Sequence, residues 1–239
     1  MEKLKYVKDN ITICNADCME VLKKLPANYI DLIVTDPPYP TTKRGNGKSQ
    51  TTGGMLKSEL SNKGKMFKHN DIKPSTYVPE LYRVLKEGSH CYIMTNHINL
   101  QEILNTAIAS GFHFIKSLIW VKDNKIMGQS YMSQFEYILF FRKGKHKKIH
   151  NCGTSDVLNF PNKKLKDEQG ANYHPTEKPV EMMKVLIENS SNVGDLVFDP
   201  FCGIGSVALA SQYLGRKFGG CELDPKYFIT LVKRLNGEI

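Results

Sequence analysis

Apolar and polar positions along the chain form two alternating patterns, short apolar runs typical of strands and longer segments with the period of a helix. The strand-like runs cover residues 11–14, 31–35, 90–95, 112–121, 135–141, 196–198 and 218–221. The helical segments cover residues 18–25, 75–86, 100–109, 180–190, 206–214 and 225–235. Strands that alternate with helices predict an α/β fold with a doubly wound sheet.

Two of the strand-like runs follow one another without a helix between them. Residues 112–121 and 135–141 are joined only by a polar segment that contains a glycine. Parallel neighbours need a long crossover, whereas antiparallel neighbours do not. We therefore expect these two strands to pair antiparallel.

The size and composition of the chain limit the class of protein. A length of 239 residues with 41% hydrophobic content predicts a single main domain, residues 1–239. No stretch approaches the roughly 20 apolar residues that span a bilayer, and the first residues lack a signal-peptide core, so we expect a cytoplasmic protein without a membrane partner. The six cysteines form no C-x-x-C pair, which predicts reduced thiols and no metal site.

The net charge of +9 is confined to two polar segments. Residues 40–73, a basic loop insertion, contain eight Lys or Arg against two acids, and residues 143–170 contain seven Lys against three acids. One such loop would be an ordinary solvated surface, but two of them favour a polyanion as partner, because lysines bind phosphates as point charges. The candidate phosphate contacts are Lys43, Arg44, Lys48, Lys143, Lys145, Lys147 and Lys148.

A compact group of acceptors follows the apolar strand 31–35, in the run Asp36-Pro37-Pro38-Tyr39. Proline lacks an N–H and keeps the residue before it extended, so the Asp36 and Pro37 carbonyls should point away from the sheet. The Asp36 carboxylate and the Pro37 carbonyl can each accept one hydrogen of a planar amine, while Tyr39 stacks on its face. The run predicts a site for adenine or cytosine, although a simple turn remains the alternative. A base in a duplex would have to be extruded to reach it.

A second motif combines a strand, a glycine turn and the start of a helix. Gly203 and Gly205 allow the backbone to approach a ligand closely, and Glu222 follows the next strand, where an acid binds ribose hydroxyls. Asp199 precedes the glycines, and its carboxylate suits an ammonium group better than a pyrophosphate. S-adenosylmethionine has that ammonium group, a ribose and no phosphate, so we expect it as the cofactor. A plain corner between strand and helix is the alternative.

Two further segments carry candidate cofactor contacts. In His174-Pro-Thr-Glu-Lys-Pro179, the side chains of Thr176 and Lys178 can hold the carboxylate of a methionine-like ligand, although Thr176 can also be a helix N-cap. Asp17 follows the first strand and is about as well explained by a helix N-cap as by a contact to an adenine amino group.

The three motifs together resemble one known family. T-D-P-P-Y at 35–39, H-P-T-E-K-P at 174–179 and F-C-G-I-G-S at 201–206 resemble the amino-methyltransferases that act on DNA, in the order of the permuted β-class. The resemblance implies a mostly parallel seven-stranded sheet with one antiparallel strand, the class I methyltransferase fold. It also implies that Asp36, Pro37, Pro38 and Tyr39 hold the target amine, and that the cofactor contacts are Asp17, Thr176, Lys178, Asp199, Phe201, Gly203, Gly205 and Glu222.

The resemblance also bears on the substrate and the partners. Asp before Pro-Pro-Tyr is similar to the members that methylate the N6 amine of adenine, with N4-cytosine, RNA methylation and a catalytically silent DNA-binding regulator as alternatives. Residues 143–173 would be a short target-recognition region, and dimerisation is one remedy that the family uses for such shortness. A homodimer and a cognate restriction endonuclease are therefore the partners left open besides DNA.

Overall fold

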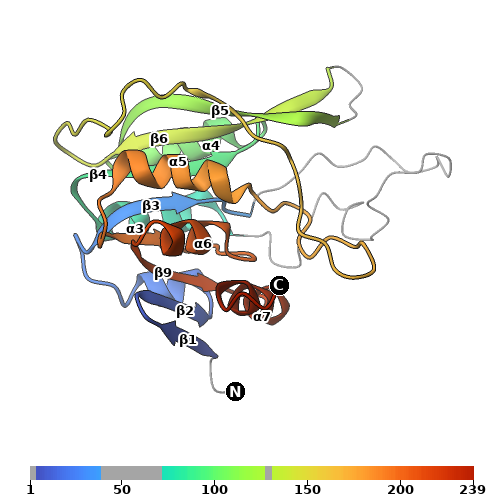
Figure 1. Ribbon diagram of the computed structural model, residues 1–239. Helices are drawn as coiled ribbons and strands as arrows, with labels where there is room; N and C mark the ends of the chain where they lie inside the picture. The colour runs from blue at the N-terminus through green and yellow to red at the C-terminus, as the bar shows by residue number, and fades with distance from the viewer. Residues whose placement is uncertain (1–3, 39–71, 127–130) are drawn as a thin grey trace.

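The structure, a computed structural model, describes residues 4–38, 72–126 and 131–239 (Figure 1). The described strands are β1 (Lys5–Lys8), β2 (Ile11–Asn15), β3 (Ile30–Thr35), β4 (Leu85–Thr95), β5 (His113–Ile126), β6 (Ser133–Arg142), β7 (Val157–Asn159), β8 (Leu196–Asp199) and β9 (Lys217–Glu222). The described helices are α1 (Cys18–Leu22), α3 (Pro74–Val84), α4 (Leu100–Ala109), α5 (Val180–Ser190), α6 (Ser206–Tyr213) and α7 (Pro225–Leu235).

The strands form one sheet in the order β1-β2-β9-β8-β3-β4-β6-β5-β7. The seven strands from β2 to β5 in this order are parallel except β6, which is antiparallel to both of its neighbours. The seven-stranded sheet with one antiparallel strand is thus confirmed, including the pairing of β5 with β6. Two short strands extend it: β1 pairs antiparallel with β2, and β7 pairs parallel with β5.

Helices cover both faces of the sheet (Figure 1). Helices α5 and α6 lie in front of it in this view, and their buried residues form one apolar core with residues of β2, β4 and α7. Helices α3 and α4 lie behind it, and they form a second core with the opposite side chains of β3, β4 and β6. The alternation of side chains along each strand supplies both cores, as a doubly wound sheet requires.

The element boundaries follow the hydrophobic pattern closely. Helices α4, α5 and α7 cover the predicted residues, whereas β4 begins at Leu85, five residues before the apolar run at 90–95. The early part of β4 contains exposed or partly exposed polar residues, whereas residues 89–95 are all buried. Within the described residues, no helix combines the length and the apolar character needed to cross a membrane.

The two edges of this sheet have different roles. We call the edge where β2, β3, β8 and β9 end the carboxyl edge, and the opposite edge the amino edge. Strand β6 runs the other way, so its start reaches the carboxyl edge, while its last residue, Arg142, pairs with His90 and His113 at the amino edge.

Candidate active site

The end of β3 and the end of β8 meet at the carboxyl edge. The two strands are parallel neighbours, with Leu32 opposite Val197 and Ile33 opposite Phe198. The buried Thr35 hydroxyl therefore reaches Asp199 and donates a hydrogen bond of 2.7 Å to its Oδ1. Asp36 is the next residue, so the strand pairing places the acceptor run and the glycine motif at one corner.

The glycine turn after β8 depends on close approach of the backbone. Gly205 caps α6 with φ +86°, and a Cβ at this position would lie 2.7 Å from Leu231 Cγ of α7. Gly203 has φ +53°, and its N–H donates to Glu222 Oε2 at 2.8 Å. Positive φ favours glycine, and at Gly205 a side chain would also collide with Leu231. The turn thus holds Glu222, at the end of β9, beside the start of α6.

Two buried carboxyl groups line this corner. Burial raises the pKa of Asp199 to about 7, against hydrogen bonds from Thr35 and from the Phe201 N–H. Burial also raises the pKa of Glu222 to about 7, although hydrogen bonds from the N–H groups of Asp224 and Gly203 oppose this rise. A ligand that brings an ammonium group or hydroxyl donors would stabilise the ionised forms. The corner therefore suits the polar groups of S-adenosylmethionine.

Lys178 connects the H-P-T-E-K-P segment to the acceptor run. Its side chain is 5% exposed, and its Nζ lies 2.5 Å from Asp36 Oδ2 and 3.3 Å from Glu136 Oε2. The side chain of Asp36 is 22% exposed, and burial raises its pKa although Lys178 opposes this effect. The other oxygen, Asp36 Oδ1, is buried and has no hydrogen-bond partner within the described part of the chain. One oxygen is thus held by a cation, and one remains as an acceptor.

Glu136 and Lys122 are members of the site that the sequence analysis missed. They lie on β6 and β5, and Lys122 Nζ is 2.5 Å from Glu136 Oε1. Burial opposes ionisation of Glu136, but Lys178 and Lys122 outweigh it and lower its pKa to about 2. A signal existed in the sequence, because β6 is antiparallel and a charged residue near its start must face the carboxyl edge.

Trp120 forms an aromatic wall beside these charges. The Nζ atoms of Lys122 and Lys178 lie 4.9 and 6.0 Å from the centre of its ring, and its Nε1 donates to the Phe160 carbonyl at 2.8 Å. Cations are attracted to the face of such a ring. Trp120 therefore helps to keep the two lysines in place. Among the described residues, no cluster of three or more His, Cys, Asp or Glu side chains could hold a metal ion.

The remaining candidate cofactor residues, Thr176, Phe201 and Asp17, make different contacts within the protein. The Thr176 carbonyl accepts from Lys178 at 3.3 Å, and its N–H donates to His174 Nδ1 at 3.2 Å. The Phe201 ring contacts Tyr77 edge-on at a centroid distance of 5.1 Å. Asp17 accepts from Met19 N at 2.8 Å, so it is a helix N-cap, and its contact to an adenine remains a prediction.

The prediction that Lys143 contacts DNA phosphates is wrong. This lysine follows β6 at the amino edge, is 7% exposed, and donates to Asn28 Oδ1 at 2.8 Å and to the Tyr82 and Leu85 carbonyls at 2.7 Å. Burial lowers its pKa. Its ammonium group is solvated by the protein and is not available to an external anion.

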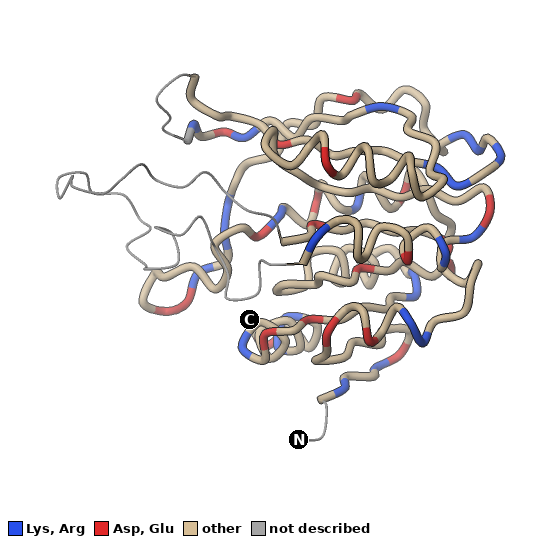
Figure 2. Tube along the Cα trace, turned by 180° about the vertical axis from the view of Figure 1, so that it is seen from behind, with Lys and Arg blue, Asp and Glu red and all other residues tan. Residues whose placement is uncertain are grey.

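The other lysines of this loop are exposed or partly exposed but lie far from Asp36. Lys145, Lys147 and Lys148 follow Lys143 at the amino edge, where basic residues gather in the view from behind (Figure 2). The part of β4 from His90 to Thr95 spans roughly 17 Å. The contact of Lys145, Lys147 and Lys148 with DNA phosphates stays a prediction.

The second half of residues 143–173 returns to the carboxyl edge. Lys164 Nζ donates to the Glu177 carbonyl, and Leu165 N donates to Glu177 Oε2 at 2.6 Å. Exposed Lys163 and Lys166 flank this contact. The part of the region that faces the site is thus residues 163–173. Tyr39, Lys43, Arg44 and Lys48 lie outside the described residues.

A model of the DNA methylase family, the N6 and N4 methyltransferases, matches residues 30–233. The chain belongs to this family. The match includes the acceptor run, the glycine turn and Glu222, so the family expected from the three motifs is confirmed.

Individual relatives agree with this assignment. Type II methyltransferase M.HinfI of Haemophilus influenzae is 29% identical, over 96% of this chain and 70% of that protein. The crystal structure of the M1.HpyAVI–SAM complex is similar in fold, with a TM-score of 0.67 and 24% identity over 94% of this chain and 99% of the other. The cytosine-N4-specific PvuII DNA methyltransferase has a TM-score of 0.74 and 17% identity, over 96% and 87% of the two chains.

Proposed function

We propose that this DNA methylase transfers the methyl group of S-adenosylmethionine to the N6 amine of adenine in DNA. The observation that carries the proposal is the corner at the carboxyl edge, where Asp36 lies beside Asp199 and the glycine turn. Family membership supports DNA as the substrate, and the SAM complex of a protein with the same fold supports the cofactor.

The residues of the glycine corner fit the cofactor. We assign Asp199 and Glu222 to its ammonium group and ribose hydroxyls, Gly203, Gly205 and Phe201 to its close contacts, and Thr176 and Lys178 to its carboxylate. The pKa values of about 7 for both acids support this assignment, because a ligand with several donors would stabilise their carboxylates. The cofactor supplies an electrophilic methyl group on a sulfonium sulfur. The protein then needs mainly to position the amine opposite that group.

Asp36 supplies the acceptor for the amine. The lone pair of an exocyclic amine is delocalised into the base, so acceptors fixed on its hydrogens favour the nucleophilic form and stabilise the growing positive charge. We assign this role to Asp36 Oδ1, which has no hydrogen-bond partner within the described residues, together with the Pro37 carbonyl. Burial raises the pKa of Asp36, and the Lys178 ammonium group opposes that rise and so favours the carboxylate form. Pro38 and Tyr39 remain predicted parts of this pocket.

The DNA must present a single base to this corner. Extrusion of a base from the duplex costs a few kcal/mol, and contacts to the phosphates on either side compensate for it. We propose residues 163–173, with the exposed Lys163 and Lys166, as the described part of the DNA surface, together with the predicted contacts Lys43, Arg44 and Lys48. We further expect a cytoplasmic protein, and a homodimer and a cognate restriction endonuclease remain predicted partners.

Methylation of the N4 amine of cytosine is the second candidate. The specific observation in its favour is the fold likeness to the cytosine-N4-specific PvuII enzyme. Both bases present the same planar amine, so Asp36 and Pro37 fit either one. The identity of the product nucleoside separates the two candidates.

The test combines product identification with one pair of variants. The protein is incubated with labelled S-adenosylmethionine and with DNA, RNA or protein as acceptor, and the digested product is identified by mass spectrometry. We expect N6-methyladenine in DNA, a loss of methyl transfer in Asp36→Ala, and cofactor binding by calorimetry that survives. Asp31→Asn, which changes a carboxylate at the other end of β3, is the control and should keep its activity. Near-normal turnover in Asp36→Ala would refute the proposal.

A further inference from the structure

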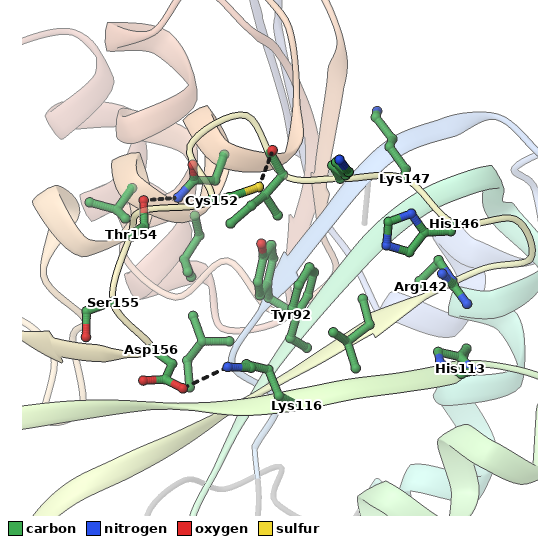
Figure 3. Close-up of a pocket in the computed structure, with 18 residues that line it drawn as sticks. Tyr92, His113, Lys116, Arg142, His146, Lys147, Cys152, Thr154, Ser155 and Asp156 are labelled. Carbon is green, nitrogen blue, oxygen red and sulfur yellow. Dashed lines mark hydrogen bonds and ion pairs between the residues drawn. The ribbon is translucent and has the colours of Figure 1, made fainter.

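A pocket of about 360 Å³ lies at the amino edge, away from the corner described above (Figure 3). Its walls are Tyr92 of β4, the amino half of β5, the end of β6, the loop of residues 146–156 and the second half of α5. The residue of β4 that lines the pocket is Tyr92, which lies three residues, roughly 10 Å, before Thr95 at the carboxyl edge. The methyl-transfer proposal leaves this pocket without a role.

The floor of the pocket is apolar. It is formed by the side chains of Tyr92, Leu118, Phe140, Ile149, Val185 and Leu186. The rings of Tyr92 and Phe140 are stacked, with centroids 4.6 Å apart and planes at 8°, and the Tyr92 hydroxyl is bonded to Ser190 Oγ at 2.7 Å. The polar end of Tyr92 is thus satisfied inside the protein. The floor presents hydrocarbon to a ligand, which favours a flat or branched apolar body.

One end of the pocket is cationic. Figure 3 shows Arg142, His146, Lys147 and His113 together at one end, with Thr154 and Ser155 at the other. Arg142 Nε is buried and has no hydrogen-bond partner among the described residues. A buried donor without a partner is unfavourable, and an anion would satisfy it with a charge-assisted bond.

The acid of the pocket does not neutralise this end. Among the described residues that line the pocket, Asp156 is the single acid, and it is paired with Lys116 at 2.9 Å. Lys116 and Asp156 lie to the side of the Arg142 cluster (Figure 3). Among the lining residues that the structure describes, no acid compensates the charges of Arg142 and Lys147 at this end.

We propose that this pocket binds a small amphipathic anion, with an apolar body on the floor and one carboxylate or phosphate group at Arg142. An anion without an apolar part would leave the floor of the pocket exposed to water. A neutral apolar ligand would leave the Arg142 donor unpaired. The pocket volume fits a ligand of the size of a substituted naphthalene. A DNA duplex is too wide to enter, so the site is distinct from the surface that we assign to DNA.

The first experiment uses the fluorescent probe 8-anilinonaphthalene-1-sulfonate on the full chain. We expect one molecule bound per chain, displaced by 1-naphthyl phosphate and by 1-naphthoate, which separate a phosphate from a carboxylate ligand. Inorganic phosphate and the neutral 1-naphthalenemethanol should each compete at least about tenfold more weakly. Arg142→Met should weaken binding of the probe by about tenfold, because methionine removes the charge and keeps an unbranched apolar side chain. Lys24→Met, which also replaces a positive charge by methionine but at an exposed site elsewhere, is the control.

A second readout places the probe within the molecule. Cys152 lines the pocket and is exposed, whereas four of the other five cysteines are buried and Cys14 is half-buried. Bound probe should slow the reaction of Cys152 with a thiol reagent, and Cys152→Ser should remove that signal. Equal binding to Arg142→Met, no protection of Cys152, or displacement by S-adenosylhomocysteine would overturn the proposal. Protection by duplex DNA but not by the naphthyl anions would also overturn it, and would assign the pocket to the DNA surface.

Discussion

The two edges of the sheet each hold a buried lysine, and the partners of the two lysines differ. At the amino edge, Lys143 is surrounded by neutral acceptors, one amide oxygen and backbone carbonyls. At the carboxyl edge, Lys178 is held by two carboxylates, Asp36 and Glu136. Carbonyl oxygens of the backbone cannot leave, whereas a carboxylate can exchange its partner for a substrate. From this comparison we expect Lys143 to stabilise the fold and Lys178 to serve the proposed methyl transfer.

Removing Lys178 tests the chemical half of this comparison and should have the largest effect. Lys178→Met leaves Asp36 and Glu136 as neighbouring acids without their shared cation, which raises the pKa of Asp36 further. We expect the rate of methyl transfer at neutral pH to fall by about a hundredfold. The acidic limb of the pH–rate profile should move to higher pH. The pH dependence of kcat in methylation assays measures this. An unchanged limb with only a weaker cofactor would restrict Lys178 to cofactor binding.

Removing Lys143 tests the structural half. Lys143→Met leaves several buried acceptors unpaired, so we expect a loss of about 3 kcal/mol in the free energy of unfolding. The folded fraction should keep its turnover within about twofold, and the salt dependence of DNA binding should not change. Denaturant unfolding and binding at several salt concentrations measure these quantities. Lys145→Met, an exposed change in the same loop, is the control, and a smaller salt slope in Lys143→Met would contradict the assignment.

A variant of Glu136 tests the role of Lys178 from the other side, because Glu136 and Lys178 shift the pKa of Asp36 in opposite directions. Its charge raises the pKa of Asp36, so Glu136→Gln should move the acidic limb of the rate to lower pH. Lys178 would then be held by Asp36 alone, and we expect a loss of turnover of about tenfold. A double-variant cycle with Lys178→Met measures the coupling. Additive effects would show that Glu136 does not act through the lysine.

The smallest effects concern the pH dependence of stability, which has opposite signs for Asp199 at the carboxyl edge and His90 at the amino edge. Asp199 has a pKa raised to about 7, so its contribution to the free energy of unfolding is lost as pH rises from about 4 to 7, by up to about 1.4 kcal/mol per pH unit. Burial lowers the pKa of His90 to about 4, so the free energy of unfolding gains a contribution from His90 as pH rises from about 4 to 6.5. Asp199→Asn should remove the loss, and His90→Asn should remove the gain.

These contributions appear as differences between Tm–pH curves of the variants and the parent protein. Glu188→Gln, an exposed change on α5, is the control for a general loss of charge. Parallel curves for all variants would mean that neither buried group has a shifted pKa.

The fold was largely predictable because the hydrophobic pattern is local. Helix α4 and helix α5 are complete amphipathic segments, and the absence of a helix between β5 and β6 was sufficient to predict their antiparallel pairing. The short strands β1 and β7 were not predicted, because four and three half-exposed residues carry too little periodicity. Their pairing depends on neighbours that are formed elsewhere in the chain.

The candidate site was predictable only in part, for a different reason. The meeting of Asp36 and Asp199 follows from motifs that adjoin strand ends, and parallel strand ends share an edge. The acceptors around Lys143 come from the carbonyls of Tyr82 and Leu85, some 60 residues away, and no sequence pattern marks a carbonyl. A count of charged residues does not distinguish Lys143, which is buried, from Lys145, which is exposed.

Helix α5 begins directly after Lys178 and ends at Ser190, whose hydroxyl contacts both His90 and Tyr92. Its eleven residues span about 16 Å, with Lys178 before its first turn and the floor of the anion pocket along its second half. A shift of the helix along its axis would thus be transmitted undiminished between the methylation corner and the far pocket. Thermodynamic linkage requires any coupling carried by this helix to change the two affinities by the same factor in both directions.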